Sequence, residues 1–280
     1  CRRDPDARIG YFDFGGTHLR GVVEGDNGSK TTYDLDDRRD DIFSALDFVL
    51  SIHPDIKSIG ISFAGQVHNN IIVSAPNIDA KNLDIASKYK KQGITVKVDN
   101  DLKCAALAEA DCFGSGFVSA LYVGTGIGSA YVNDGKVVGG FKNIAGEIGH
   151  IPYKDIGIRC GCGKIGCLEV ISSGSGLSKR LSVMGLETMS LLEIAKNPEI
   201  SFLADEFVDG VAYAASLILT LLNPQILVLG GGIVSSNGWL VETVRQKVVT
   251  GAFFGAVDSC EIVSSKLQNG SLEGARLLAL

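Results

Sequence analysis

The feature that most constrains this chain is a cysteine cluster with a histidine shortly before it. Its four members are His150, Cys160, Cys162 and Cys167. Three thiols and one imidazole form a tetrahedral ligand set for zinc, and the glycines between the cysteines let the backbone bring the sulfurs within about 4 Å of one another. Such a site has no open coordination position, so the metal is expected to be structural. Glu147 and Glu169 lie within three residues of ligands at either end, so the metal either shapes a polar binding site or serves folding alone.

Charge and hydropathy exclude several classes of protein. The net charge of -6 gives no general reason to bind nucleic acid or an anionic membrane. The longest apolar run, residues 211–222, is too short to span a bilayer. The N-terminus lacks the apolar core of a signal peptide, which favours a cytoplasmic enzyme, and clustered cysteines then favour metal binding over disulfides. We therefore expect no nucleic-acid partner and no membrane partner.

Two similar turns occur in the two halves of the chain. Strands predicted at residues 9–14 and 19–23 flank a turn with two glycines and a threonine, and a strand at 121–123 runs into an alternating Gly/Thr turn before a strand at 130–132. A dinucleotide-binding motif would be followed by a helix, so that interpretation is weak. The first turn alone could be an ordinary hairpin. Two such turns suggest duplicated lobes that each offer backbone N–H groups to one polyphosphate.

A run of polar residues separates a predicted strand from a predicted helix. The strand at 95–98 ends in Asp99-Asn100-Asp101, and strong helix formers follow to residue 113. Helix capping explains one of these side chains but not three in a row. Because α/β enzymes place their sites where strands end, Asp101 is a candidate functional residue. The element order predicts an α/β protein with a mixed sheet and two lobes, residues 9–102 with 271–280 and residues 103–270.

Six motifs follow one another along the chain: Asp13-x-Gly15-Gly16-Thr17, Asn100-Asp101, Gly124-Thr125-Gly126-x-Gly128, Glu147-x-x-His150, Cys160-x-Cys162-Gly163-x-x-Gly166-Cys167-x-Glu169 and Gly230-Gly231-Gly232. In order and spacing they resemble the ROK family of sugar kinases and related transcriptional repressors, and the resemblance covers residues from about 9 to 280. The cysteine motif is highly specific, whereas each glycine turn alone is weak. The resemblance implies the two-lobed, actin-like ATPase fold of ribonuclease-H-like lobes, as in hexokinase and Hsp70.

The resemblance also implies roles for individual residues. Asp101 matches the catalytic base, which accepts a proton from a sugar hydroxyl as the hydroxyl attacks the γ-phosphate of ATP. Asp13 would orient hydrated magnesium. The residues that would surround the phosphates and border the adenosine are Gly15, Gly16, Thr17, Gly124, Thr125, Gly126, Gly230, Gly231 and Gly232. The positions that match sugar contacts are Gly65, Asn77, Asn100, Asp101, Glu147, His150 and Glu169.

Some residues depart from the family pattern and leave the sugar open. Ala64 replaces a usual proline, Leu102-Lys103 replaces a common Ala-Asn pair, and His18 stands where Lys or Asn is frequent. Lys103 would place a cation near the sugar or phosphate path. We expect a small-molecule sugar substrate, a glucokinase-like hexose or an N-acetylhexosamine, and a homodimer or homotetramer. The alternatives are a sugar-sensing repressor, for which too few residues precede Asp13 to hold a DNA-binding region, and a zinc-stabilised scaffold without catalysis.

Overall fold

The chain forms two compact units. The computed structural model describes residues 8–16, 18–38, 40–74, 82–114 and 116–280. The first unit comprises Cys1–Cys112, Gly139–Ile144 and Leu267–Leu280, and the second comprises Phe113–Val138 and Ala145–Lys266. The boundary therefore falls after residue 112 and not at residues 102/103 as expected, and a short segment, Gly139–Ile144, joins the first unit.

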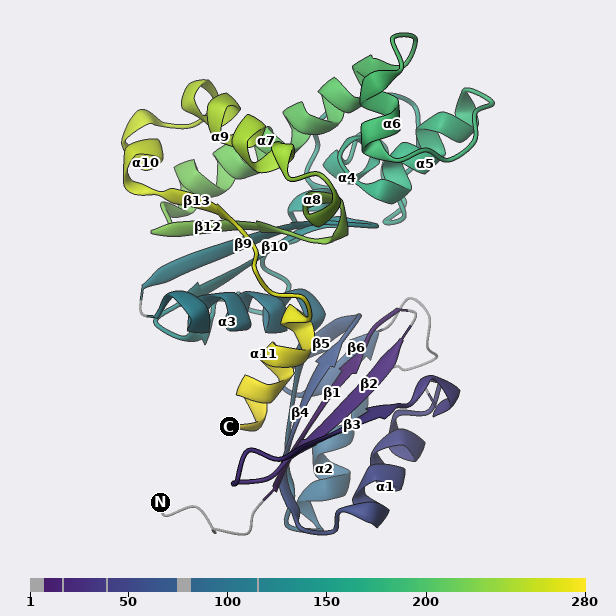
Figure 1. Ribbon diagram of the computed structural model, residues 1–280, viewed down its shortest axis with the longest axis vertical. Helices are drawn as coiled ribbons and strands as arrows, with labels where there is room; N and C mark the ends of the chain where they lie inside the picture. The colour runs from purple at the N-terminus through teal and green to yellow at the C-terminus, as the bar shows by residue number, and fades with distance from the viewer. Residues whose placement is uncertain (1–7, 17, 39, 75–81, 115) are drawn as a thin grey trace. The chain divides into compact units, whose positions relative to one another are not determined.

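The first unit is built on a five-stranded sheet with the order β3-β2-β1-β4-β8 (Figure 1). Its strands are β1 (Arg8–Phe14), β2 (Leu19–Glu24), β3 (Lys30–Asp34), β4 (Ile56–Phe63) and β8 (Thr95–Asn100). A small sheet contains β5 (Gln66–His68), β6 (Ile71–Ser74) and β7 (Leu83–Asp84). The helical segments are η1 (Asp36–Arg38), α1 (Ile42–Ile52), α2 (Ile85–Lys90), α3 (Asp101–Phe113) and α11 (Gly270–Ala279).

Alternation of side chains along β1 gives this sheet two buried faces. Phe12 and Phe14 pack into a core that includes α1, whereas Tyr11, on the opposite face, packs with Leu272 and Ala275 of α11. Successive residues of a strand point to opposite faces, so one short apolar strand supplies both cores. The hairpin predicted from residues 9–23 is confirmed, because β1 and β2 pair antiparallel.

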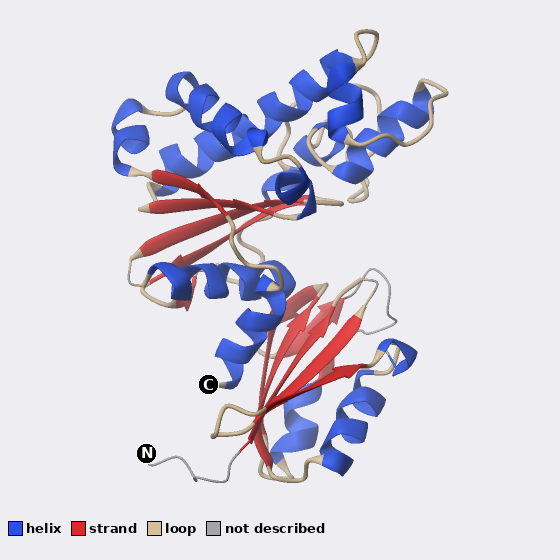
Figure 2. Cartoon of the chain, viewed as in Figure 1, coloured by secondary structure: helices blue, strands red, loops and turns tan. Residues whose placement is uncertain are grey.

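The second unit is built on another five-stranded sheet, with the order β11-β10-β9-β12-β13. Figure 2 draws the strands in red and the helices in blue. Its strands are β9 (Phe117–Val123), β10 (Ile127–Asn133), β11 (Lys136–Val137), β12 (Ile226–Gly230) and β13 (Glu261–Ser264). Its helical segments are η2 (Ile148–His150), α4 (Leu168–Ile171), α5 (Gly174–Val183), α6 (Leu191–Lys196), α7 (Ser201–Leu222), α8 (Gly232–Ser236), α9 (Trp239–Gly251) and α10 (Phe254–Ser259). Its core extends over α5, α6, α7 and α9.

The two sheets share one topology. In each, the central strand pairs antiparallel with the next strand of the chain and parallel with a strand that returns after a helix: β1 with β2 and β4, and β9 with β10 and β12. The third strand extends each hairpin, and the fifth pairs parallel with the fourth. The duplication expected from the paired glycine turns is therefore present in the backbone.

Helix α11 approaches its neighbours at backbone distance. A Cβ atom on Gly60 of β4 would lie 1.8 Å from the carbonyl oxygen of Ala275, and one on Gly274 would lie 1.9 Å from the carbonyl oxygen of Cys104 in α3. Only glycine permits such contacts. They join α3 and α11 to the first sheet, which is why the unit boundary follows α3 and does not precede it.

Among the residues that the structure describes, no helix combines the length and the apolar character needed to cross a membrane.

Substitution of Gly60 by Ala tests the α11 contact. The added methyl group would overlap the backbone of α11, so the variant should lose about 1–3 kcal/mol of unfolding free energy or more, as overpacked cores do. Urea denaturation measures the change. Gly238→Ala is the matched control, because its Cβ position has no atom of a described residue within 4 Å apart from its own neighbours along the chain, and its φ of -56° suits alanine. Equal stabilities for the two variants would contradict the contact.

Candidate functional site

The cysteine–histidine cluster comes together in the second unit. One donor atom from each of His150, Cys160, Cys162 and Cys167 lies within 4.8 Å of the other three. His150 ends η2, Cys167 is the N-cap of α4, and the other two lie in the loop between. That loop is closed by two backbone hydrogen bonds, from Cys160 N to Lys164 O (2.8 Å) and from Gly163 N to Cys160 O (3.0 Å).

The spacing of the donor atoms fits a tetrahedral zinc ion. The Sγ atoms of Cys162 and Cys167 are 3.6 Å apart, and Cys160 Sγ lies 3.6 Å from Nδ1 of His150. Ideal Zn–S bonds in a tetrahedron separate sulfurs by about 3.8 Å. Four protein donors would fill the coordination sphere of a bound zinc ion. The ion would therefore stabilise the loop and would have no open coordination position for a substrate.

The carboxylates beside the cluster face different neighbours. Nε2 of His150, the nitrogen turned away from Cys160, lies 3.9 Å from Oε2 of Glu147. Oε1 of Glu169 is 3.4 Å from Cys160 Sγ, and its Oε2 would be 2.8 Å from a Cβ on Gly126. Glu169 therefore connects the cluster to the glycine turn after β9.

The glycine segments of the second unit also lie together. The β9–β10 turn is closed by a hydrogen bond from Gly124 N to Gly126 O (2.9 Å), and its Gly124 and Thr125 carbonyls accept bonds from the start of α5. The backbone nitrogen of Gly232 is 3.9 Å from the Cβ position of Gly124, and Gly231, with φ +93°, passes against Val123. The predicted phosphate segment at residues 124–126 and the predicted adenosine segment at residues 230–232 thus lie together where β9 and β12 end.

Asp101 is the first residue of α3, and its neighbours hold it firmly. Oδ1 accepts hydrogen bonds from Leu102 N (2.8 Å) and from Asn100 Nδ2 (2.9 Å). The same Asn100 amide donates to the carbonyl oxygen of Gly65 at 3.1 Å. The structure therefore brings together Gly65, Asn100 and Asp101, as the resemblance implied.

Burial raises the pKa of Asp101 to about 6, and the negative charge of Asp13 adds to this effect, while the Leu102 and Asn100 hydrogen bonds oppose it. A carboxyl group with a pKa near neutral can accept a proton from an alcohol more readily than an ordinary aspartate can. The arrangement is suited to general-base chemistry.

Asp13 is held by two serines that sequence reasoning missed. Oδ1 accepts a hydrogen bond from Ser62 Oγ (2.7 Å), and Oδ2 accepts one from Ser271 Oγ (2.8 Å). Ser62 lies on β4 and Ser271 lies in α11, so neither is near Asp13 in sequence. Nothing in the sequence around Asp13 indicates that these two serines will contact it.

The first glycine turn is closed by its own backbone. Gly15 N donates to the carbonyl oxygen of His18 at 3.0 Å, and His18 Nδ1 is 2.8 Å from Oδ2 of Asp36. Gly16 at the tip of this turn is exposed. Thr17 and Asn77, which were also expected to contact ligands, lie outside the described residues.

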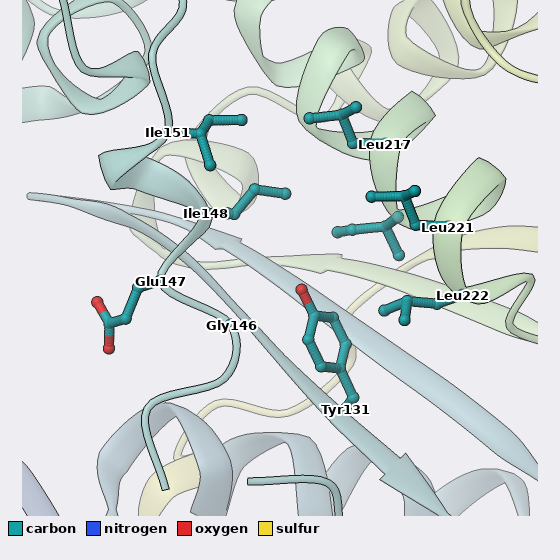
Figure 3. Close-up of a pocket in the computed structure, with 9 residues that line it drawn as sticks. Tyr131, Gly146, Glu147, Ile148, Ile151, Leu217, Leu221 and Leu222 are labelled. Carbon is teal, nitrogen blue, oxygen red and sulfur yellow. The ribbon is translucent and has the colours of Figure 1, made fainter. Parts of the chain in front are cut away.

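An apolar pocket of about 290 Å³ lies in the second unit beside the segment that carries Glu147 (Figure 3). Its lining comprises Tyr131, Gly146, Glu147, Ile148, Ile151, Leu217, Ile218, Leu221 and Leu222. Figure 3 shows the carboxylate of Glu147 pointing away from the leucine side chains. Walls of this kind cannot satisfy a polyhydroxylated ligand, so the polar chemistry belongs to the residues above.

Comparison with known proteins gives consistent matches. The ROK family profile matches residues 10–280. A glucokinase from Halalkalibacterium halodurans is 31% identical over 259 residues, covering 81% of this chain and 78% of the relative. An N-acetylmannosamine kinase from Vibrio cholerae is 31% identical over 198 residues, covering 67% of this chain and 69% of the relative.

The crystal structure of a ROK hexokinase from Thermus thermophilus aligns with a TM-score of 0.79 at 24% identity and covers 97% of each chain. This likeness confirms the expected actin-like fold class.

Replacement of one thiol tests the cysteine–histidine cluster. The purified chain should contain about one zinc per molecule, and Cys162→Ser should lose most of it, because a tetrahedral structural site needs all four donors. Elemental analysis measures the content, and thermal denaturation should show a lower Tm. Cys112→Ser, also at an exposed cysteine but outside the cluster, serves as the control. Full zinc content in Cys162→Ser would exclude this ligand set.

Proposed function

The chain belongs to the ROK family, and we propose on this premise that it transfers the γ-phosphoryl group of ATP to a hydroxyl group of a hexose or an N-acetylhexosamine. The observation that carries the proposal is the half-buried Asp101, whose pKa is raised to about 6 and whose carboxylate is held by Asn100. The matched relatives named as kinases support the reaction class. The repressor alternative is less supported, because the relatives matched by sequence are named as kinases and the likeness to a solved ROK family transcriptional regulator, at 22% identity, shows the fold alone.

Asp101 is assigned the role of general base. Its carboxylate accepts the proton of the attacking sugar hydroxyl, and Asn100 keeps one oxygen of the carboxylate fixed while the other meets the substrate. Phosphoryl transfer depends mainly on positioning and charge neutralisation, so a rigid base suits it. ATP and magnesium supply, when bound, the electrophilic phosphoryl group and its neutralising charge.

The other residues are assigned to binding. Asp13, fixed by Ser62 and Ser271, would hold hydrated magnesium. The backbone donors for phosphate would come from Gly15, Gly16, Thr17, Gly124, Thr125 and Gly126, with Gly230, Gly231 and Gly232 beside the adenosine. Association as a homodimer or homotetramer stays a prediction of the resemblance.

Sugar hydroxyls would contact polar residues that include His150 and the carboxylates beside the cysteine–histidine cluster. His150 would bind zinc through Nδ1 and donate a hydrogen bond from Nε2 to a hydroxyl, since zinc fixes the tautomer. Glu147, Glu169, Asn100, Gly65 and Asn77 would supply the remaining contacts. The zinc therefore shapes the sugar site without taking part in the chemistry.

A substrate panel tests the proposed activity. ADP release should be seen with at least one of glucose, mannose, fructose, allose, N-acetylglucosamine and N-acetylmannosamine. Glucose is the first expectation because relatives named glucokinase match most of the chain. Absence of turnover with every sugar would exclude the kinase assignment.

Asp101→Asn tests the base. Turnover should fall by about 10²- to 10⁴-fold while sugar binding is kept, because only proton acceptance is lost. For the wild type, kcat/KM should fall about tenfold per pH unit below about pH 6, where Asp101 becomes protonated. Steady-state kinetics across pH 5–8 measure both effects, and normal turnover by Asp101→Asn would contradict the assignment.

Asp101→Asn, which should lower turnover, should increase the stability of the fold. The pKa of Asp101 is higher in the folded chain than its ordinary 3.8. Its ionisation therefore lowers the stability of the fold as the pH rises from 3.8 to about 6, and the penalty is fully present above about pH 6. Asp101→Asn should therefore raise the Tm at pH 7–8. Asp111→Asn, at an exposed site of the same helix, is the matched control and should change neither turnover nor Tm.

A further inference from the structure

Lys103 is a buried cation in the first turn of the helix that begins with Asp101. Only 4% of its surface is exposed, and its Nζ donates a hydrogen bond to the carbonyl oxygen of Asn143 at 2.7 Å. Burying an ammonium group is costly unless it is paired. The Lys103 side chain is therefore held inside the first unit. This geometry does not favour the expected role of placing a cation near the sugar or phosphate path.

Asn143 links that lysine to a buried aspartate. Its side-chain Nδ2 donates to Oδ1 of Asp99 (2.8 Å) and to the carbonyl oxygen of Val67 (2.9 Å). Its backbone adopts φ +57°, a left-handed conformation that asparagine tolerates better than most residues. Gly139 makes room for the carboxamide, because a Cβ there would lie 2.0 Å from Oδ1 of Asn143.

Asp99 is connected to the proposed base, Asp101, through Asn100. Its Oδ1 also accepts the backbone N–H of Asn100 at 2.8 Å, and Asn100 in turn donates to Asp101 at 2.9 Å. Burial raises the pKa of Asp99, while the Asn143 and Asn100 hydrogen bonds and the charge of Lys103 lower it. The lysine thus favours the ionised form that accepts both N–H groups.

We propose that Lys103 and Asn143 are positioning residues that act through Asp99 and Asn100 to fix the carboxylate of Asp101. The proposal rests on the proposed function of Asp101. Neither residue needs to touch a substrate. A displacement of a reacting group by about 1 Å can reduce a rate about a hundredfold, so a polar network of this kind can govern turnover without contributing to binding.

Two unrelated substitutions perturb the network. Lys103→Met removes the hydrogen-bond donor and the positive charge but keeps a side chain of similar size. Gly139→Ala displaces the Asn143 carboxamide without changing any charge. Each should lower kcat about tenfold to a hundredfold, with the KM values for sugar and ATP unchanged within about threefold. Lys97→Met, at an exposed lysine of β8, and Gly238→Ala, at an uncrowded glycine, are the controls and should leave kcat unchanged.

A double mutant separates positioning from a general loss of structure. If Lys103 acts through Asp101, adding Lys103→Met to Asp101→Asn should cause no further fall in kcat. A fall in kcat as large as in the wild-type background would overturn the proposal, and so would a Lys103→Met variant with lower Tm but normal kcat.

Hydrogen exchange supplies a readout that does not depend on catalysis. The amides of Asn100 and Leu102, which are bonded to Asp99 and Asp101, should exchange faster in Lys103→Met and in Gly139→Ala than in the two controls. A wild-type chain without kinase activity would remove the proposed function, while this exchange experiment would still decide whether the network fixes the Asp101 region. Unchanged exchange in both variants would overturn the inference.

Discussion

The close approach of α11 to the first sheet is the contact on which the position of Asp13 in the proposed site depends. Gly60 and Gly274 let the helix reach β4 and α3 at backbone distance, and the same helix delivers Ser271 to one oxygen of Asp13. Ser62, two residues after Gly60 on β4, holds the other oxygen. The C-terminal helix is thus part of the site's framework, because an Asp13 carboxylate without these donors would lack two of its fixed contacts.

Three carboxyl groups share the end of the first sheet, and their burial sets the character of the site. Desolvation raises the pKa of both Asp99 and Asp101, and Asp13 adds its charge to the effect on Asp101. Each group is compensated by fixed donors and not by a surface ion pair, so its geometry is well defined. The same burial that destabilises an ionised Asp101 makes it a better proton acceptor, which is a usual conflict between stability and activity.

In the second unit, the polar residues around the cysteine–histidine cluster lie mainly on loops, which need another source of rigidity. Cys160 and Cys167 are buried, and the loop between His150 and Cys167 has little regular structure. Four metal donors can fix such a loop where hydrophobic packing is sparse. Glu169 then extends the order of the cluster to the β9–β10 turn through its contact at Gly126.

The sequence by itself determined the elements and the chemical types of the site, because strands, glycine turns and the cysteine spacing are local patterns. It predicted the paired hairpins, the strand that leads into Asp101 and the cluster of one histidine and three cysteines. It did not predict Ser271 beside Asp13, the Asn143 contact with Asp99, or the extent of the first unit to residue 112. Those features join residues far apart in the chain, and only tertiary packing, through backbone approaches that glycine alone allows, decided which of them meet.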